Sequence, residues 1–190
     1  MFIQTEDTPN PNSLKFIPED KLNNSKGPIN FGSLEDAEKS PLAKTLFSID
    51  GVNGVFYGSD FITISKRENV DWPEIKPLIM LTIMEHFSKK IPLYNDEKQS
   101  KSTGSNEINE DDSAVVKEIK EIIEHRVRPA VAQDGGDIIF HSFKDGILKL
   151  ELHGACSGCP SSTVTLKNGI ENMIRHYVPE IESVEAINAE

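Results

Sequence analysis

Apolar and polar positions in the first half of the chain form short stretches that predict a small sheet. Apolar residues at 1–5 and 14–17 predict two strands, because a segment rich in proline and asparagine that favours turns separates them. Residues 52–57 and 61–66 predict a β-hairpin, since they flank the turn-forming sequence Gly58-Ser59-Asp60.

Two helices are predicted in the same half. Ser40 followed by Pro41 is typical of a helix start, with a capping hydroxyl and then proline at the first helical position. From Asp71 to Pro92 the apolar residues recur every four positions, which predicts a long amphipathic helix with Leu78 beside its apolar stripe. The recurring positions are Ile75, Ile79, Ile83 and Phe87.

The second half repeats this alternation of helix and strand signals without repeating the sequence. Residues 115–127 place their apolar side chains on one helical face, and Pro129 predicts that this helix ends or kinks at Arg128. The sequence Asp134-Gly135-Gly136-Asp137 predicts a turn, and residues 138–143 and 147–153 predict a hairpin.

The end of the chain predicts one more helix and one more strand. Apolar positions between Val164 and Tyr177 have helical spacing, and residues 183–187 predict a short strand that closes the sheet. Both halves therefore predict an α+β fold, a small sheet with helices packed on one face.

Residues 95–112 separate the two halves. This stretch is acidic and has a single apolar residue, Ile108, so it cannot bury enough surface to offset the entropy lost on ordering. We expect a flexible, disordered linker at 95–112, an N-terminal domain at 1–94 and a C-terminal domain at 113–190.

Charge and composition narrow the function. The net charge of −11 disfavours nucleic acids and anionic membranes, because both need Lys or Arg to neutralise phosphates. No stretch approaches the roughly 20 apolar residues of a membrane span. The first residues are acidic and lack the basic or apolar pattern of a targeting segment, so we expect a cytoplasmic protein.

The chain has two cysteines, Cys156 and Cys159, in a Gly- and Ser-rich loop that leaves a predicted strand and enters a predicted helix. Gly158 allows the backbone to turn so that both sulfurs converge. The partial positive charge at the start of the helix is expected to favour the thiolate form, which a metal ligand requires.

Three chemistries fit this loop. A thiol–disulfide oxidoreductase uses the same C-x-x-C spacing at a helix start. A zinc site needs four ligands, of which His153 or His176 could supply the remainder. An iron–sulfur cluster typically takes four thiolates, which two copies of the chain would supply at a two-fold interface. Buried, unreactive cysteines are the remaining alternative.

Longer stretches resemble a known family. The sequences R-V-R-P-A-V-A-Q-D-G-G-D-I at 126–138 and G-A-C-S-G-C-P-S-S-T-V-T-L-K-N-G-I-E-N-M-I at 154–174 resemble the C-terminal domain of NifU-like proteins. The segments at 8–16 and 40–64 resemble the N-terminal domain of Nfu proteins. The resemblance covers nearly the whole chain apart from residues 95–112.

This resemblance implies an iron–sulfur cluster carrier that is not an enzyme. It implies that Cys156 and Cys159 of two protomers hold one 4Fe-4S cluster in a homodimer. It also implies that the cluster comes from an upstream scaffold and passes to recipient apoproteins. Because the sequence opens without a targeting extension, it resembles bacterial, cytoplasmic members more than mitochondrial precursors.

Overall fold

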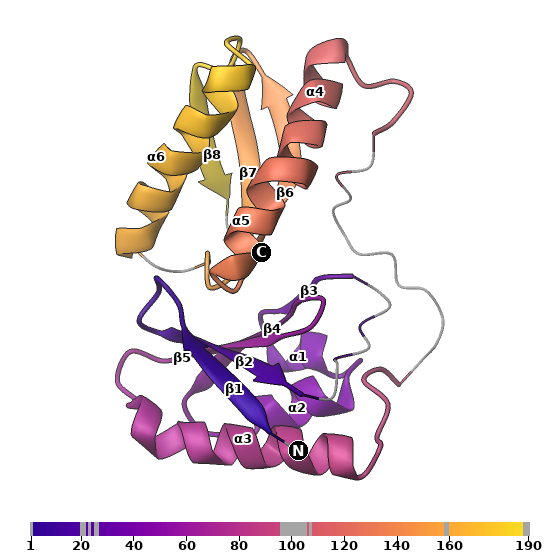
Figure 1. Ribbon diagram of the computed structural model, residues 1–190, viewed down its shortest axis with the longest axis vertical. Helices are drawn as coiled ribbons and strands as arrows, with labels where there is room; N and C mark the ends of the chain where they lie inside the picture. The colour runs from indigo at the N-terminus through magenta and orange to yellow at the C-terminus, as the bar shows by residue number, and fades with distance from the viewer. Residues whose placement is uncertain are drawn as a thin grey trace. The chain divides into compact units, whose positions relative to one another are not determined.

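The structure, a computed structural model, divides into two compact units, Met1–Ser102 and Thr103–Glu190 (Figure 1). It describes residues 2–19, 22, 24, 27–95, 106, 108–157 and 160–187, and for residues 160–167 it describes the helix without its side chains. The central part of the predicted linker and Cys159 lie outside the described residues.

Unit 1 contains a five-stranded sheet in which every neighbouring pair of strands is antiparallel, in the order β1-β2-β5-β4-β3. Its strands are β1 (Ile3–Asp7), β2 (Ser13–Pro18), β3 (Ile29–Phe31), β4 (Val52–Tyr57) and β5 (Ile62–Lys66). The predicted strands are confirmed. Strand β3 was not predicted, because a strand of three residues is too short to show an alternating pattern.

Three helices complete unit 1: α1 (Leu34–Ala37), α2 (Pro41–Phe47) and α3 (Trp72–Ser88). As predicted, Ser40 caps α2, and its side chain accepts a hydrogen bond from the backbone of Ala43. The apolar stripe of α3 is buried in the unit 1 core, whereas Leu78 is 51% exposed and does not join it.

Unit 2 contains a three-stranded sheet in the order β6-β7-β8. Strands β6 (Gly136–Lys144) and β7 (Ile147–Gly154) form the predicted antiparallel hairpin, and β8 (Ser183–Ile187) pairs with β7 in parallel. The crossover between β7 and β8 is helix α6 (Pro160–Tyr177). Figure 1 shows α4 and α6 on the same side of this sheet.

The first helix of unit 2 does not end at Arg128, so one of the two outcomes predicted from Pro129 is wrong. The helix runs from α4 (Ala114–Ile122) through a wider π-helical turn, η1 (Ile123–Val127), into α5 (Arg128–Gln133). In that turn the Arg128 N–H donates to the carbonyl of Ile123, five residues earlier. We attribute the wider turn to Pro129, which has no N–H and whose ring crowds the preceding turn.

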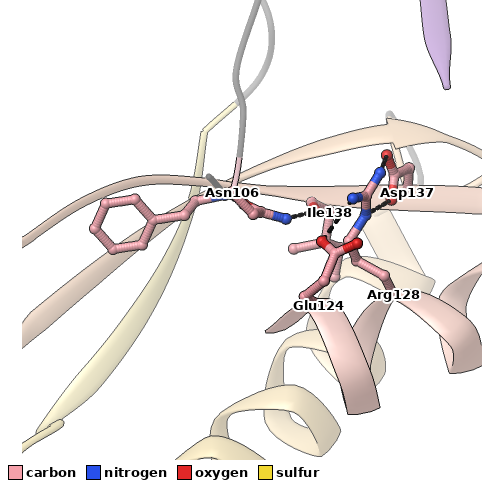
Figure 2. Close-up of polar contacts among 6 residues, drawn as sticks. Asn106, Glu124, Arg128, Asp137 and Ile138 are labelled. Atoms are coloured by element: carbon pink, nitrogen blue, oxygen red, sulfur yellow. Dashed lines mark hydrogen bonds and ion pairs between the residues drawn. The ribbon is translucent and has the colours of Figure 1, made fainter. Parts of the chain in front are cut away.

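Two asparagines within the predicted linker, Asn95 and Asn106, each contact one of the units. The Asn95 side chain donates to the carbonyl of Glu38 at 2.9 Å in unit 1. In unit 2 the Asn106 side chain accepts from Phe140 N at 2.7 Å and donates to Ile138 O at 3.4 Å along the free edge of β6 (Figure 2). Within the described part of the chain, no helix is long and apolar enough to cross a membrane.

Candidate functional site

Cys156 lies in a tight turn that follows strand β7. Gly154 ends the strand with a φ of 63°, a conformation that glycine adopts without strain. The backbone N–H of Cys156 then donates to the carbonyl of His153 at 3.3 Å, and Ser157 Oγ donates to the carbonyl of Gly154 at 2.8 Å. The turn holds Cys156 with its side chain inward, and only 3% of the residue is exposed.

The thiol of Cys156 packs directly on Gly136, the first residue of β6. Gly136 pairs with Gly154 in the hairpin, so the two strands bring the turn and the start of β6 together. A Cβ atom at position 136 would overlap Cys156 Sγ and would also approach the carbonyl of His153 at 2.9 Å. Glycine is therefore required at 136 for the thiol to occupy this position.

The surroundings of Cys156 favour the neutral thiol. Burial, together with the negative charges of Asp134 and Asp137, raises the pKa of Cys156 to about 12. The expectation that the loop stabilises a thiolate is therefore wrong for Cys156 in this conformation. The helix start was expected to dominate, but removal from water and two nearby carboxylates oppose the charge.

Figure 2 shows a carboxylate–guanidinium cluster of Arg128, Asp137 and Glu124, in which Asp137 directly follows Gly136 on β6. Arg128 donates from Nε and Nη2 to the two carboxylate oxygens of Asp137, at 2.8 and 2.9 Å, and from Nη1 to Glu124 at 2.7 Å. Asp137 is 4% exposed. The hydrogen bond with Asp137 is the largest cause that raises the pKa of Arg128. The cluster ties η1 and α5 to the start of β6.

The turn predicted at Asp134-Gly135-Gly136-Asp137 is confirmed, but its sequence also carries functions that the prediction missed. Gly136 forms the seat of the thiol and Asp137 anchors Arg128. The signal was present in the resemblance, because this segment belongs to the same family-like stretch, residues 126–138, as Arg128. Sequence reasoning could not connect it to Cys156, which lies one hairpin away.

The two histidines considered as zinc ligands, His153 and His176, both contact other side chains. His153 Nε2 hydrogen-bonds Glu151 Oε1 at 2.7 Å on β7. The His176 ring packs edge to face with Tyr177 near the end of α6, with ring centroids 5.1 Å apart. Among the described residues, no group of three His, Cys, Asp or Glu side chains could hold a metal ion. The zinc interpretation therefore finds no support in the described part of the site.

Cys159 remains a prediction from the sequence, because it lies outside the described residues. Helix α6 begins at Pro160, so Cys159 directly precedes the helix. Proline suits the first position of a helix, where no partner for its nitrogen is needed.

Two family models match the chain in the order of its units. Residues 3–90 match the model described as the scaffold protein Nfu/NifU N-terminal domain, and residues 119–185 match the NifU-like domain. The chain belongs to the Nfu/NifU-like family. The NifU-like match contains both cysteines, the Cys156 seat and the Arg128 cluster.

Known relatives of this Nfu/NifU-like chain extend beyond it. Proteins of Drosophila sechellia and Drosophila willistoni named "NFU1 iron-sulfur cluster scaffold homolog, mitochondrial" are each 50% identical over 98% of the chain. The chain spans only 65% and 64% of their lengths. A solution structure of a NifU-like protein from Saccharomyces cerevisiae is 29% identical, covers 51% of this chain and 87% of its own, and has a TM-score of 0.46.

These relatives contradict the expected bacterial-type cytoplasmic location, since their names place them in mitochondria. The expectation depended on the acidic character of the first residues. The relatives are longer than the region that matches, so the start of this sequence carries no information about a leader.

Proposed function

We propose that this Nfu/NifU-like chain is a scaffold and carrier for iron–sulfur clusters. Two copies hold one cluster, a 4Fe-4S cluster by preference, through Cys156 and Cys159 of each copy, and pass it to recipient apoproteins. The observation that carries the proposal is the donor set. Each chain supplies two thiols on a loop inside its NifU-like domain, half of the usual four.

Binding requires a change at the loop, because an inward thiol that is 3% exposed cannot contact a cluster shared with a second copy. Cys156 Sγ has to leave Gly136 and lose its proton, since the thiolate is the ligand. In the described conformation, burial protects the Cys156 thiol from oxidation.

The cluster is cargo in this proposal, and no substrate bond is broken. A recipient with free thiolates displaces Cys156 and Cys159 in turn, so the chain acts without catalysing a covalent conversion of its own. A cluster held at an interface between two copies can be released when the copies separate. Such release suits a carrier, which has to give up its cluster. Unit 1 is proposed to hold partners during this exchange.

The rival function, a thiol–disulfide oxidoreductase, has less support. A nucleophilic thiol of that class needs a lowered pKa and access to its substrate. In the described conformation Cys156 shows the opposite on both counts, since burial and two carboxylates raise its pKa to about 12. Cluster binding needs the same release of the thiol, but the relatives are named as iron–sulfur cluster scaffolds, which favours the cluster function.

Anaerobic reconstitution with iron and sulfide tests the proposal. We expect four iron atoms per two chains, a dimer by size-exclusion chromatography with light scattering, and broad absorbance near about 400 nm. Cys156→Ser and Cys159→Ser should each abolish stable loading. Ser157→Ala is the matched control, because it changes the same loop and leaves both thiols.

Transfer is measured by adding a cluster-free four-iron ferredoxin to the loaded dimer and following the gain of cluster by circular dichroism. Deleting residues 1–94 tests whether unit 1 contributes to this rate. A monomer that carries a full cluster, or a chain that binds no iron under oxygen-free conditions, contradicts the proposal. Stoichiometric disulfide exchange by a colourless monomer would instead favour the oxidoreductase.

A further inference from the structure

An exposed group of side chains lies across η1 and the end of α6, away from the cysteine loop. It consists of Arg126, Met173, His176 and Tyr177, and we call it the Arg126–Tyr177 patch. The guanidinium carbon of Arg126 lies 4.8 Å from the centroid of the Tyr177 ring, and the His176 ring packs edge to face with Tyr177. Met173 and Tyr177 are 36% and 40% exposed.

Arg126 differs from the other two arginines between residues 113 and 190. Arg128 binds Asp137 and Glu124, and Arg175 binds Glu171. In the described part of the chain, Arg126 makes no ion pair, although acidic residues outnumber basic ones by 31 to 20. Arg126 is therefore exposed beside an aromatic ring, and no carboxylate among the described residues is bound to it.

Two separate elements, η1 and the end of α6, position these side chains. The π-helical turn carries Arg126 on the exposed side of the helix while Val127, the next residue, is buried. Tyr177 is the last residue of α6, and Met173 lies one turn earlier on the same face. Stacking on Tyr177 restricts the Arg126 side chain before any partner binds, which lowers the entropy lost on binding.

We propose that the Arg126–Tyr177 patch docks a partner protein through a segment that presents a carboxylate next to an apolar side chain. Arginine binds a carboxylate with two parallel hydrogen bonds, and among the residues that the structure describes no carboxylate occupies the Arg126 guanidinium. The Met173 thioether and the Tyr177 ring supply the adjoining apolar surface. Arginine, tyrosine and methionine are enriched at the centres of protein interfaces.

The Tyr177 side of the patch lies at the end of α6 opposite to the end that follows the cysteine loop. The cysteine loop precedes the first residue of α6, whereas Tyr177 is its last, and a helix of this length extends about 25 Å. Docking and ligand exchange thus occupy opposite ends of one helix. The patch contains no residue of the cysteine loop, so this inference does not rest on cluster binding.

Binding is tested on the cluster-free full chain with a fluorescein-labelled peptide, Glu-Glu-Leu-Phe-Glu-Glu, by anisotropy. Met173 is the only methionine between residues 103 and 190, so its ¹³C-methyl NMR signal locates the peptide. We expect saturable binding that shifts this signal. Arg126→Gln should weaken binding about tenfold, and Tyr177→Ala by a similar factor.

Arg175→Gln is the matched control, since it removes the same charge from α6 but from a side chain already bound to Glu171. It should change affinity less than twofold. A peptide with Lys in place of Glu should not bind. Equal losses for the Arg126 and Arg175 variants, an unshifted Met173 methyl signal, or no saturable binding would each overturn the proposal. Because the patch residues are exposed, thermal unfolding of each variant should match that of the parent.

Discussion

At the scale of single residues, the contact between Gly136 and Cys156 decides how the thiol behaves. Position 136 has room for a hydrogen atom but not for a methyl group. The reactive thiol of Cys156 is therefore held inside unit 2. The loop sequence suggests a thiol that both binds metal and reacts readily. Burial lowers the reactivity of Cys156 without removing it as a metal ligand.

The first prediction concerns the contact between Gly136 and the Cys156 thiol. In a Cys159→Ser background, Cys156 should react with iodoacetamide at pH 8 about 50-fold more slowly in the folded chain than in urea, because its raised pKa leaves little thiolate. Gly136→Ala should remove most of this protection and destabilise unit 2 by about 2 kcal/mol, since the added methyl group displaces the thiol. Mass spectrometry of the alkylated chain measures the rates.

Gly169→Ala is the control for that substitution. A Cβ at position 169 meets no atom within 4 Å, and the residue is exposed within α6. It should leave alkylation unchanged and stabilise the helix by up to about 1 kcal/mol. Equal protection in the Gly136 variant and its parent would show that the contact does not govern reactivity.

At the scale of secondary structure elements, the Arg128 cluster is the main polar connection between the first helix of unit 2 and strand β6. Asp137 is nearly fully buried, and its two carboxylate oxygens are bound by two nitrogens of one guanidinium. Removal of one partner of such a pair leaves a buried charge without compensation.

We therefore predict that Arg128→Ala destabilises unit 2 by about 3 kcal/mol, and that Arg128→Lys recovers little of this loss because an ammonium cannot bind both oxygens in the same plane. Denaturant titrations followed by the amide NMR signals of β6 and β7 report unit 2 alone. Arg175→Ala breaks an exposed pair with Glu171 and should have an effect below about 1 kcal/mol. Equal effects of the two alanine variants would contradict the role of burial.

Elements with clear periodicity could be predicted from the sequence, and those set by distant contacts could not. The four-residue repeat of α3 and the alternation in β7 gave their positions because local patterns encode burial. The three-residue strand β3 has no such pattern. Pro129 does not end the helix, because a wider helical turn accommodates it. The burial of Cys156 depends on Gly136, which is brought beside it by pairing of β6 with β7.

At the scale of the whole molecule, the two units have separate cores and should respond separately to pH. His86 is the only histidine between residues 1 and 102, and it is 6% exposed in the unit 1 core. Its Nε2 has no hydrogen-bond partner among the described residues, and burial lowers the pKa of His86.

A base whose pKa is lowered on folding stabilises the folded state above its unfolded pKa, and this stability is lost as pH falls through the folded value. Unit 1 should therefore lose stability below about pH 6.5. The single tryptophan, Trp72, lies in unit 1, so urea titrations followed by its fluorescence measure this at pH 8, 7, 6 and 5. His86→Phe should flatten the dependence, and an unchanged slope in that variant would contradict the assignment.

The contacts of Asn95 and Asn106 fix the length of chain between the two units, which limits how far apart the units can be. Asn95 is bonded to unit 1 and Asn106 to unit 2, and the eleven residue steps between them have a contour length of about 40 Å. Any protein that binds unit 1 is thereby kept at an effective concentration of about millimolar near the cysteine loop of the same chain. Under the proposed carrier function, cluster delivery to a recipient already bound to unit 1 would follow first-order kinetics, with a rate that does not depend on how dilute the recipient is in the surrounding solution.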